Sequence, residues 1–389
     1  MGFMKYLTLE TFTDFVCTGS DCPYTCCGGG WNIGIDEETA AFYRTVEGEM
    51  GERLRNCIRK EGNNAFFILD EHGNCPFLNE KGLCDIILNI GEEHLSNTCT
   101  YYPRYAFYAG DICFAGVSIS CPEVAKFYMT RTEPLMIDFA DDGESVSEER
   151  KTDWNLFNQA IRLFTSAVGI AQNRNYSVNE RLALIVLFTN GFQSCIDTGQ
   201  DPGHVTDLMS DESRYKRILT DAGLYTEDGT VMADFCVRIT GYLSKMENAG
   251  RYLPELAEMA SYFDDPGNRE LDPDRLARSY ELICNDTNSI WQENILVYIL
   301  YKYLMPDYEN RDFYIHLMTG LGLVYNVSIG ILSLYHYIRE EEAPEEYRIM
   351  LIAHLSRMIE HNKDRRDKAV AHFSDTGILD PEYVLKLLF

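Results

Sequence analysis

Basic residues are scarce in this chain of 389 residues. Lysine and arginine together number 34, against 61 aspartate and glutamate residues, and the formal charge is −27 at pH 7. Nucleic acids and anionic membrane surfaces are bound through a basic footprint, so we expect neither as a partner. The net negative charge favours solubility, and it also suits a cationic ligand or a protein substrate that presents lysine.

The start of the chain lacks the features of an export signal. The segment MGFMKYLTLETF contains no apolar core and no small-residue cleavage site of the signal-peptide kind. We therefore expect a cytoplasmic protein. In a reducing compartment, clustered cysteines bind metals or carry out redox chemistry more often than they form disulfides.

Three cofactor motifs are also missing. The two Cys-x2-Cys pairs of a zinc ribbon do not occur. The Cys-x3-Cys-x2-Cys motif of radical S-adenosylmethionine enzymes is absent because Cys26 and Cys27 are adjacent. No predicted strand is followed by a glycine-rich turn and a helix, so a Rossmann-type nucleotide site is not indicated. The sequence Gly320-Leu321-Gly322 lies inside a helical pattern, and we interpret it as structural.

Cysteine is concentrated in the first third of the chain. Ten of the 13 cysteines precede residue 122, and Cys17, Cys22, Cys26 and Cys27 fall within eleven residues, directly before glycines 28–30. Thiolates are soft ligands that select iron–sulfur clusters or zinc. The pattern therefore predicts a thiolate-ligated centre in this third. The alternative is a set of buried free cysteines that pack as small hydrophobic residues.

The adjacent cysteines restrict how a metal can be held. Neighbouring side chains of an extended segment point to opposite sides, so we expect Cys26 and Cys27 to serve two sites, or one site and the core. The three glycines that follow allow the backbone to approach a bulky cluster and to donate N–H groups to its sulfides.

The sequence pattern divides the chain into three parts. Residues 1–130 combine the cysteines with glycine-containing turns and predict a small, loop-rich α+β domain. Residues 131–152 are acidic and, after Phe139, nearly free of large apolar side chains, so we interpret them as a linker. Residues 153–389 show helical periodicity almost throughout and predict an irregular α-helical domain. The predicted fold class is therefore mainly α.

The predicted elements follow from periodicity and from turn residues. In the N-terminal part we expect strands at 31–36 and 66–70, a helix capped by Asp36, a helix over 86–102 that ends at Pro103, and a hairpin over 104–120. In the C-terminal part we expect helices over 153–171, 178–196, 231–248, 253–263, 273–284, 289–305, 345–362 and 380–389.

One stretch is long enough to cross a bilayer. From Phe313 to Ile338 there is no Asp, Glu, Lys or Arg. Polar residues such as His316 and Asn326 interrupt it, however, and its flanks show no basic bias. We therefore predict a buried central helix, in one or two pieces, rather than a transmembrane span.

A series of motifs occurs in order across residues 15–128: FVCTGSDCPYTCCGGGWNIGID, CPFLNEKGLCDI, IGEEHLSNTCTYYPR and ISCPEVAKFY. This series resembles that of the flagellin lysine-N-methylase family. Weaker likeness continues at 293–306 and 354–362, so the resemblance spans most of the chain. It implies transfer of a methyl group from S-adenosylmethionine to lysine side chains of flagellin, by an enzyme that carries a 4Fe-4S centre.

The resemblance also implies which cysteines bind the metal. The motif cysteines would hold one 4Fe-4S centre, or two metal centres if all are used, while Cys57 and Cys113 lie outside the motifs. Zinc, instead of or beside the cluster, is the alternative. The implied ligands are Cys17, Cys22, Cys26, Cys27, Cys75, Cys84, Cys99 and Cys121.

Two groups of polar residues in the helical part are candidate site residues. His354, Arg357 and His361, with Glu360 beside them, lie along one stripe of a helix. The stripe is either a solvated polar face or a binding site for the carboxylate of the cosubstrate. In the second case the binding residues are Arg357, Glu360 and His361.

The second group is Glu293 and Asn294, which interrupt an otherwise apolar helix. Polar side chains buried there would need partners. We treat both as candidates for catalytic contacts to the amine or to the cofactor.

The sequence therefore predicts a cytoplasmic, S-adenosylmethionine-dependent protein-lysine N-methyltransferase. A deprotonated amine is already a good nucleophile, so the reaction needs alignment, a route for the proton and exclusion of water rather than a radical. We expect direct displacement and a structural cluster. The competing interpretations are a non-enzymatic cysteine-cluster module that binds proteins and an iron–sulfur redox protein.

Overall fold

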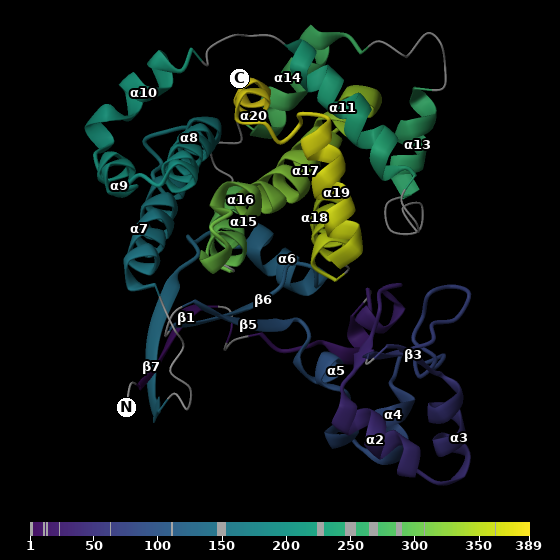
Figure 1. The fold of residues 1–389 in the computed structure, drawn as a ribbon. Helices are drawn as coiled ribbons and strands as arrows, with labels where there is room; N and C mark the ends of the chain where they lie inside the picture. The colour runs from purple at the N-terminus through teal and green to yellow at the C-terminus, as the bar shows by residue number, and fades with distance from the viewer. Residues whose placement is uncertain are drawn as a thin grey trace.

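A four-stranded sheet brings together segments that lie far apart in the first 145 residues of the chain. In the computed structural model, β1 (Phe3–Leu9) runs parallel to β6 (Ile112–Val117) and antiparallel to β7 (Ile137–Ser145). Strand β5 (Arg104–Ala109) forms a hairpin with β6 and completes the order β5-β6-β1-β7. Most of the chain between β1 and β5 leaves this sheet and forms a separate small lobe (Figure 1).

The structure describes residues 3–10, 12, 15–22, 24–62, 64–109, 112–145, 153–223, 229–245, 254–263, 271–284, 290–306, 308–361 and 363–389. The small lobe contains η1 (Gly19–Asp21), η2 (Cys26–Gly28), β2 (Gly34–Ile35), α2 (Glu37–Thr45), α3 (Gly48–Asn56), β3 (Ile58–Glu61), β4 (Asn64–Phe67), α4 (Asp85–Ile90), η3 (Glu92–His94) and α5 (Asn97–Tyr101). Strands β2, β4 and β3 form its own antiparallel sheet in that order.

The rest of the chain forms a larger body that is mostly helical. Its helices are α6 (Pro122–Thr130), α7 (Trp154–Ala171), α8 (Val178–Thr198), α9 (Gly203–Met209), η4 (Glu212–Arg214), α10 (Tyr215–Asp221), α11 (Gly229–Leu243), α13 (Pro254–Tyr262), α14 (Pro273–Cys284), α15 (Trp291–Ile299), η6 (Leu300–Leu304), η7 (Tyr308–Asn310), α16 (Phe313–Gly320), η8 (Leu321–Asn326), α17 (Val327–Arg339), α18 (Glu345–Glu360), α19 (Lys363–Asp375) and α20 (Pro381–Leu388). The predicted fold class, mainly α with a small N-terminal region that contains strands, is confirmed.

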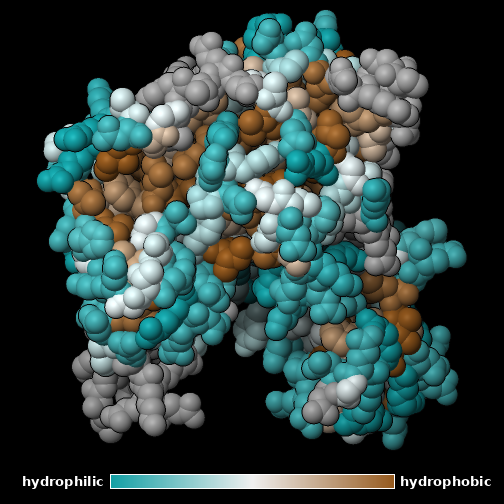
Figure 2. Space-filling model, turned by 45° about the horizontal axis from the view of Figure 1, so that its top comes forward, coloured by the Kyte–Doolittle hydropathy of each residue, from teal (hydrophilic) through white to brown (hydrophobic). Residues whose placement is uncertain are grey.

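Two separate groups of buried apolar side chains define the lobe and the body. The lobe core includes Tyr43, Phe67 and Phe77, and the body core extends from Leu9 through Phe114 to the C-terminal helix. In Figure 2 the surface of the lobe is mostly hydrophilic, and a hollow separates it from the strand end of the body. The lobe is thus a small unit with its own core, attached to the body through the ends of the sheet.

This division differs from the boundaries that the sequence predicts. Strands β1, β5 and β6 and helix α6 precede residue 130, yet their buried side chains belong to the body core. Phe114, for example, packs against Phe164 and Tyr301 of the body helices. Residues 137–145 of the predicted linker form β7, because they pair with β1 along its length. Residues 146–152 of that linker lie outside the described residues.

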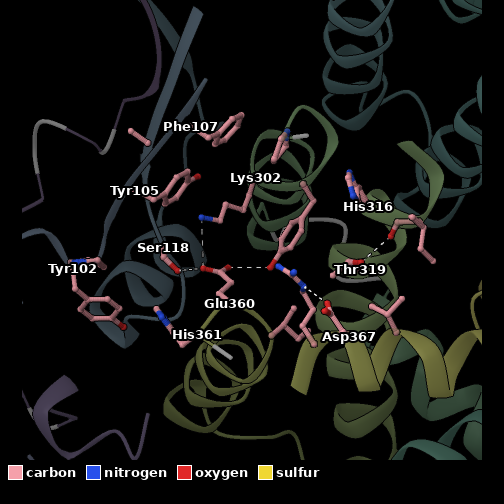
Figure 3. Close-up of a pocket in the computed structure, with 18 of the residues that line it drawn as sticks. Tyr102, Tyr105, Phe107, Ser118, Lys302, His316, Thr319, Glu360, His361 and Asp367 are labelled. Carbon is pink, nitrogen blue, oxygen red and sulfur yellow. Dashed lines mark hydrogen bonds and ion pairs between the residues drawn. The ribbon is translucent and has the colours of Figure 1, made fainter. Parts of the chain in front are cut away.

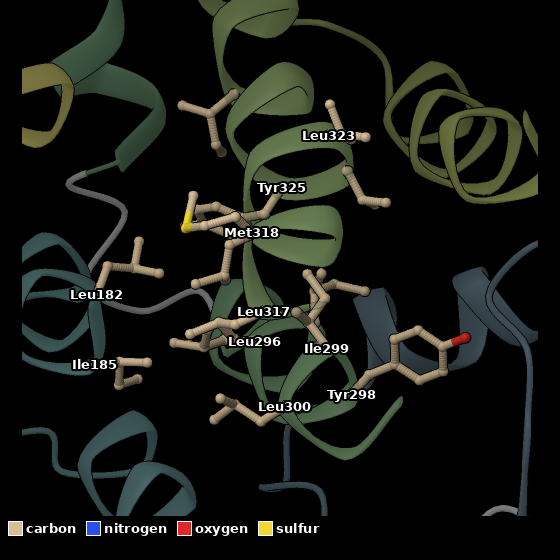
Figure 4. Close-up of a cluster of buried hydrophobic side chains, with 14 of the residues drawn as sticks. Leu182, Ile185, Leu296, Tyr298, Ile299, Leu300, Leu317, Met318, Leu323 and Tyr325 are labelled. Atoms are coloured by element: carbon tan, nitrogen blue, oxygen red, sulfur yellow. The ribbon is translucent and has the colours of Figure 1, made fainter. Parts of the chain in front are cut away.

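The long uncharged stretch forms the centre of the body. Helices α16 and α17 are joined by the π-helical segment η8, and the most apolar window of this helix is entirely buried. Figure 4 shows side chains of α15, η6 and α8, such as Leu296, Leu300 and Ile185, packed beside this helix. The stretch is long and apolar enough to cross a membrane, but its burial agrees with the predicted central helix.

The glycines of this helix are packing positions, as the sequence suggests. A methyl group added to Gly320 would lie 2.6 Å from a methyl carbon of Ile299, and one added to Gly322 would lie 2.5 Å from a methyl carbon of Leu379. Both distances are shorter than carbon atoms tolerate. The two glycines therefore allow close helix packing and do not form a nucleotide-binding turn.

Some predicted elements have different limits. The helix expected over 86–102 is interrupted at Gly91, whose φ of 103° lies in the left-handed region that favours glycine. The predicted cap is confirmed, since Asp36 accepts a hydrogen bond of 2.9 Å from the backbone N–H of Thr39. Helix α19 was not predicted because its sequence is mostly polar, and only Ala369 and Phe373 are buried.

Candidate functional site

A cavity of about 680 Å³ opens between the four-stranded sheet and the helical body. Its walls are contributed by β5, η6, α16, α18 and α19, which are distant in the sequence. The lining includes Tyr102, Tyr105 and Tyr303 together with a lysine and a glutamate, Lys302 and Glu360. Figure 3 shows Lys302 and Glu360 pointing toward each other from different helices. Cavities of this size typically hold small molecules or cofactors.

Glu360 is the centre of the hydrogen-bond network in this cavity. Its side chain is 7% exposed, and its carboxylate accepts hydrogen bonds from four hydroxyl groups: those of Ser118, Tyr298 (3.0 Å), Tyr303 (3.1 Å) and Ser356 (2.7 Å). A carboxylate offers about four lone-pair sites, so these hydroxyls hold its position. The donors come from the residue after β6 and from α15, η6 and α18, and the network therefore joins the elements that enclose the cavity.

Lys302 supplies the opposite charge. Its Nζ atom lies 4.0 Å from a carboxylate oxygen of Glu360 and 3.2 Å from the centre of the Tyr105 ring. An ammonium group is attracted by the face of an aromatic ring as well as by a carboxylate. This wall of the cavity thus already holds one lysine ammonium between an anion and an aromatic face.

The pKa values of the pair reflect their burial and their mutual attraction. Burial by itself would raise the pKa of Glu360, but Lys302, His361 and the hydrogen bonds from Ser118 and Ser356 together lower it below its ordinary value. Burial lowers the pKa of Lys302, and Glu360 opposes this change. The carboxylate is therefore ionised at neutral pH.

The predicted polar stripe on α18 is not a solvated face. His354 and Arg357 are each only 6% exposed. The guanidinium of Arg357 donates to the backbone oxygen of Ser120, with the shorter contact at 2.9 Å. His361 contacts the hydroxyl of Ser120 at 2.8 Å. The stripe is covered because the segment between β6 and α6 packs against it, which the sequence of the helix does not reveal.

Only part of the stripe reaches the cavity. Glu360 and His361 line it, whereas Arg357 lies on the other side of its wall, beside Gly29 and Cys26. The ring of His361 also packs against Trp31, with ring centres 4.7 Å apart. The three residues predicted to bind the cofactor are therefore close together, but they face two different spaces.

His361 should make the stability of the protein depend on pH. Burial, aided by the charges of Arg357 and Lys302 and opposed by Glu360, lowers its pKa to about 4. An unfolded histidine binds a proton below pH about 6.5. The folded state is therefore favoured above pH 6.5, and this contribution is lost progressively as the pH falls toward 4.

Replacement of His361 by glutamine, which keeps a group able to hydrogen-bond to Ser120, should flatten this part of the stability curve. We expect the fall in unfolding free energy between pH 7 and pH 4.5 to shrink by about 2 kcal/mol, measured by urea denaturation. His204→Gln, at an exposed position, is the control and should leave the curve unchanged. An identical pH dependence in the His361 variant would contradict this interpretation.

Glu293 and Asn294 are buried, as anticipated, and each has several partners. Glu293 pairs with Arg174 at 3.0 Å and with Arg181 at 3.1 Å. Asn294 accepts a hydrogen bond of 2.9 Å from the backbone of Leu135 and donates to the backbone of the segment 128–133. Neither residue lines the cavity. The structure thus accounts for both through contacts that hold helices and the segment before β7 together.

The eight cysteines of the motifs fall into two sets. One set lines a small hollow between the lobe and the N-terminus of α6: Cys17, Cys22, Cys26 and Cys121. The other set lies in the small lobe, with its thiols within electrostatic reach of one another: Cys27, Cys75, Cys84 and Cys99. Among the residues that the structure describes, no three cysteine, histidine or acidic side chains are arranged to hold a single metal ion.

Sequence reasoning missed several residues of the cavity. The missed group comprises Tyr102, Tyr105, Ser118, Lys302 and Tyr303. Only Lys302 had a signal that was available in the sequence, because it is the one charged residue in the apolar stretch ILVYILYKYLM. A buried cation requires a partner, so this position could have been selected. The tyrosines and Ser118 carried no such signal, since tyrosine is common throughout the chain.

Comparison with known proteins assigns the chain to a family. Residues 165–387, more than half of the chain, match the family model described as the FliB lysine N-methylase C-terminal domain. The chain belongs to the FliB lysine N-methylase family. Within this family member, the matched region contains Lys302, Arg357 and Glu360, while Tyr105 and the eight motif cysteines lie before it.

Three curated relatives match a shorter part of this lysine N-methylase family member. The flagellar biosynthetic protein FliU of Salmonella muenchen is 32% identical over 132 residues, which are 32% of this chain and 78% of FliU. The lysine-N-methylases of Salmonella choleraesuis and Salmonella typhimurium are each 31% identical over 132 residues, again 32% of this chain. The match spans only 33% of the length of these two enzymes. No solved structure matches the chain.

Proposed function

We propose that the protein is a protein-lysine N-methyltransferase that acts on flagellin, or on another protein that presents lysine, in the cytoplasm. The family supports the reaction class, and the name FliU of one relative supports a flagellar substrate. We assign the reaction to the large cavity because Lys302 is held there between Glu360 and the ring of Tyr105. This wall has the chemistry that recognises a lysine ammonium.

We further propose S-adenosylmethionine as the methyl donor, bound in the same cavity. Its sulfonium is a cation, and the aromatic ring of Tyr303 beside the Glu360 carboxylate suits a cation. In the step itself, the lone pair of the deprotonated lysine nitrogen forms a bond to the methyl carbon. The bond from this carbon to sulfur breaks, sulfur keeps the electron pair, and S-adenosylhomocysteine leaves.

The residues of the chain have three tasks in this mechanism. Glu360 compensates Lys302, so that the cavity does not repel its two cationic substrates. The walls of the cavity align the amine with the methyl carbon and exclude water. The substrate ammonium loses its proton to bulk water before the amine attacks, and no redox step is required. Glu293 and Asn294 support the helices behind the site, outside the cavity.

We also propose that the motif cysteines hold an iron–sulfur centre of the 4Fe-4S kind, with zinc as the alternative. Soft thiol ligands grouped in the fold support this assignment. Such a centre would contribute folding free energy where it forms, and in the displacement mechanism its role is structural.

The function is tested by incubating anaerobically purified protein with flagellin and S-adenosylmethionine without a reductant. We expect mass increases of about 14 Da on flagellin lysines, accompanied by S-adenosylhomocysteine. The rate should rise with pH, because free lysine has a pKa of about 10.4. Formation of 5′-deoxyadenosine, or a strict need for a reductant, would overturn direct displacement. Absence of methylation on every lysine-bearing protein tested would overturn the function.

A further inference from the structure

Cys26 and Cys27 are neighbours in the chain, but their surroundings differ. Both belong to η2, and their thiols hydrogen-bond to each other. Cys26 otherwise faces Cys121 and the guanidinium of Arg357. Cys27, in contrast, is close to three cysteines of the small lobe: Cys75, Cys84 and Cys99. The eight motif cysteines thus form two groups, one that contains Cys26 and one that contains Cys27.

We propose that the chain holds two separate iron–sulfur centres rather than one. The seam site consists of Cys17, Cys22, Cys26 and Cys121, and the lobe site consists of Cys27, Cys75, Cys84 and Cys99. This proposal rests on the metal-binding part of the proposed function and assigns the ligands of each centre. It also distinguishes their tasks: the lobe site stabilises the small lobe, and the seam site attaches the lobe to the body beside the cavity.

The seam site lies where lobe and body meet. Its cysteines line a hollow of about 50 Å³, whose wall includes Tyr102 and Pro103. The same two residues line the large cavity on their other side. Cys121 is the residue before α6 of the body, while its three partners belong to the loop that enters the lobe. A centre bound here would therefore fix that loop against the wall of the cavity.

Arg357 supports a negatively charged centre in the seam. This arginine is 6% exposed, lines the hollow and lies within electrostatic reach of Cys26 and Cys121. A cluster bound by four thiolates carries net negative charge, which a buried guanidinium compensates. The arginine that the sequence suggested for the cosubstrate thus has a second interpretation, as the counter-ion of the seam site.

The lobe site is enclosed by the lobe core. Cys75 is 7% exposed and belongs to the same buried group as Phe77 and Ile86. Its backbone N–H donates to the oxygen of Cys27 at 2.7 Å, which holds the two ligand segments together. Because so small a core supplies little stability alone, a metal centre that links η2, the 75–84 loop and α5 would contribute much of the folding free energy of the lobe.

The two sites repeat one local arrangement. Cys84 directly precedes α4 and Cys121 directly precedes α6, with nearly equal backbone angles of φ −85°, ψ 116° and φ −85°, ψ 120°. The thiol of each lies at the N-terminus of the following helix, where the nearby backbone N–H groups favour its thiolate form. Such N–H groups stabilise thiolates and tune iron–sulfur clusters. One ligand of this kind in each set supports two independent centres.

Each site offers four cysteine thiols, which is the ligand set of a 4Fe-4S centre. Four thiolates also bind zinc, so the chemical analysis below distinguishes the two metals.

The test measures iron, acid-labile sulfide and zinc in full-length protein after anaerobic reconstitution with iron and sulfide. Two centres of the 4Fe-4S kind predict about eight irons and eight sulfides per chain. Cys84→Ser and Cys121→Ser should each lose about half of this metal, and the double variant nearly all. Cys57→Ser in the lobe and Cys113→Ser in β6 are matched controls outside both sites, and they should retain all of it.

Limited proteolysis, as a second measurement, distinguishes the role of the lobe site from that of the seam site and detects unfolding of the variants. Limited proteolysis should cut residues 33–86 in Cys84→Ser but not in Cys121→Ser, because only the former loses the centre of the lobe. If Cys84→Ser does not fold, Cys99→Ser tests the lobe site, and Cys22→Ser likewise confirms the seam site. Arg357→Met should lower the metal of the seam site without changing protection of the lobe.

The outcomes distinguish this proposal from the one on which it rests. About four irons per chain, all lost in both Cys84→Ser and Cys121→Ser, would show one shared centre and overturn the division while leaving the iron–sulfur assignment. Two zinc ions without sulfide would overturn both assignments of iron. Absence of bound metal after reconstitution would overturn metal binding altogether, whereas methyl transfer is decided separately by the flagellin assay.

Discussion

The kcat/KM for methyl transfer is expected to fall by about 100-fold or more when Glu360 is replaced by glutamine, since an uncompensated charge in a buried site costs about 2–5 kcal/mol. Glutamine preserves the size of the side chain and can still accept hydrogen bonds from Tyr298, Tyr303 and Ser356. It removes the negative charge that faces Lys302 at 4.0 Å. The lysine ammonium would then repel both the substrate lysine and the sulfonium.

The opposite substitution should have the opposite electrostatic effect. Lys302→Met leaves the Glu360 carboxylate without its cation, and the remaining negative charge attracts cationic substrates. We therefore expect a much smaller loss of kcat/KM in Lys302→Met than in Glu360→Gln. The double variant should recover part of the activity and stability lost in Glu360→Gln, because no charge is left unpaired.

These variants are measured by steady-state kinetics at a temperature where circular dichroism shows all of them folded. Glu345→Gln, at an exposed position in the first turn of the same helix, is the control and should retain full activity. Equal loss of activity in Glu360→Gln and Lys302→Met would contradict the role in charge compensation. Full activity in Glu360→Gln would remove the cavity from the proposed site.

The largest loss of stability is expected for Glu293→Ala, at about 3–5 kcal/mol of unfolding free energy. Glu293 is 3% exposed and accepts from Arg174 and from Arg181, whose side chain is 8% exposed. Without the glutamate, Arg181 would remain as a buried cation that has lost its ion-pair partner. Urea denaturation at pH 7 measures the change.

The other residues of the Glu293 network provide graded controls. Arg174 is 51% exposed, so Arg174→Ala should cost about 1 kcal/mol or less, as exposed ion pairs do. The folded fraction of Glu293→Ala should keep normal kcat and KM, since Glu293 does not line the cavity. A stable but inactive Glu293 variant would instead support the catalytic contact that the sequence suggested.

The burial of polar residues illustrates the limit of reading the helices alone. The sequence places Arg357, Glu360 and His361 on one stripe, and the structure confirms that they are neighbours. Whether the stripe faced solvent depended on Ser118 and Ser120, which lie more than two hundred residues earlier. No pattern within α18 specifies what covers it, so the alternatives could not be separated from the sequence.

The cysteines show the same limit in another form. Their clustering predicted thiolate chemistry, and the adjacency of Cys26 and Cys27 predicted that both would not serve one site equally. Cys121 lies near Cys26, and Cys99 lies near Cys27. This arrangement depends on the parallel pairing of β1 with β6. This pairing returns the chain from the lobe to the body between residues 99 and 121, and it is a long-range contact without a local signal.

The sequence by itself determined the helical nature of the C-terminal part, the small N-terminal region with strands and the buried central helix. Those features follow from the local periodicity of apolar residues, which solvent exposure imposes on each element separately. The tertiary structure alone decided that β1, β5 and β6 belong to the body and that Lys302 lies beside Glu360. It also decided that a cavity forms between the four-stranded sheet and the helical body. These contacts join segments far apart in the chain, and they form because each segment buries apolar surface that it cannot bury alone.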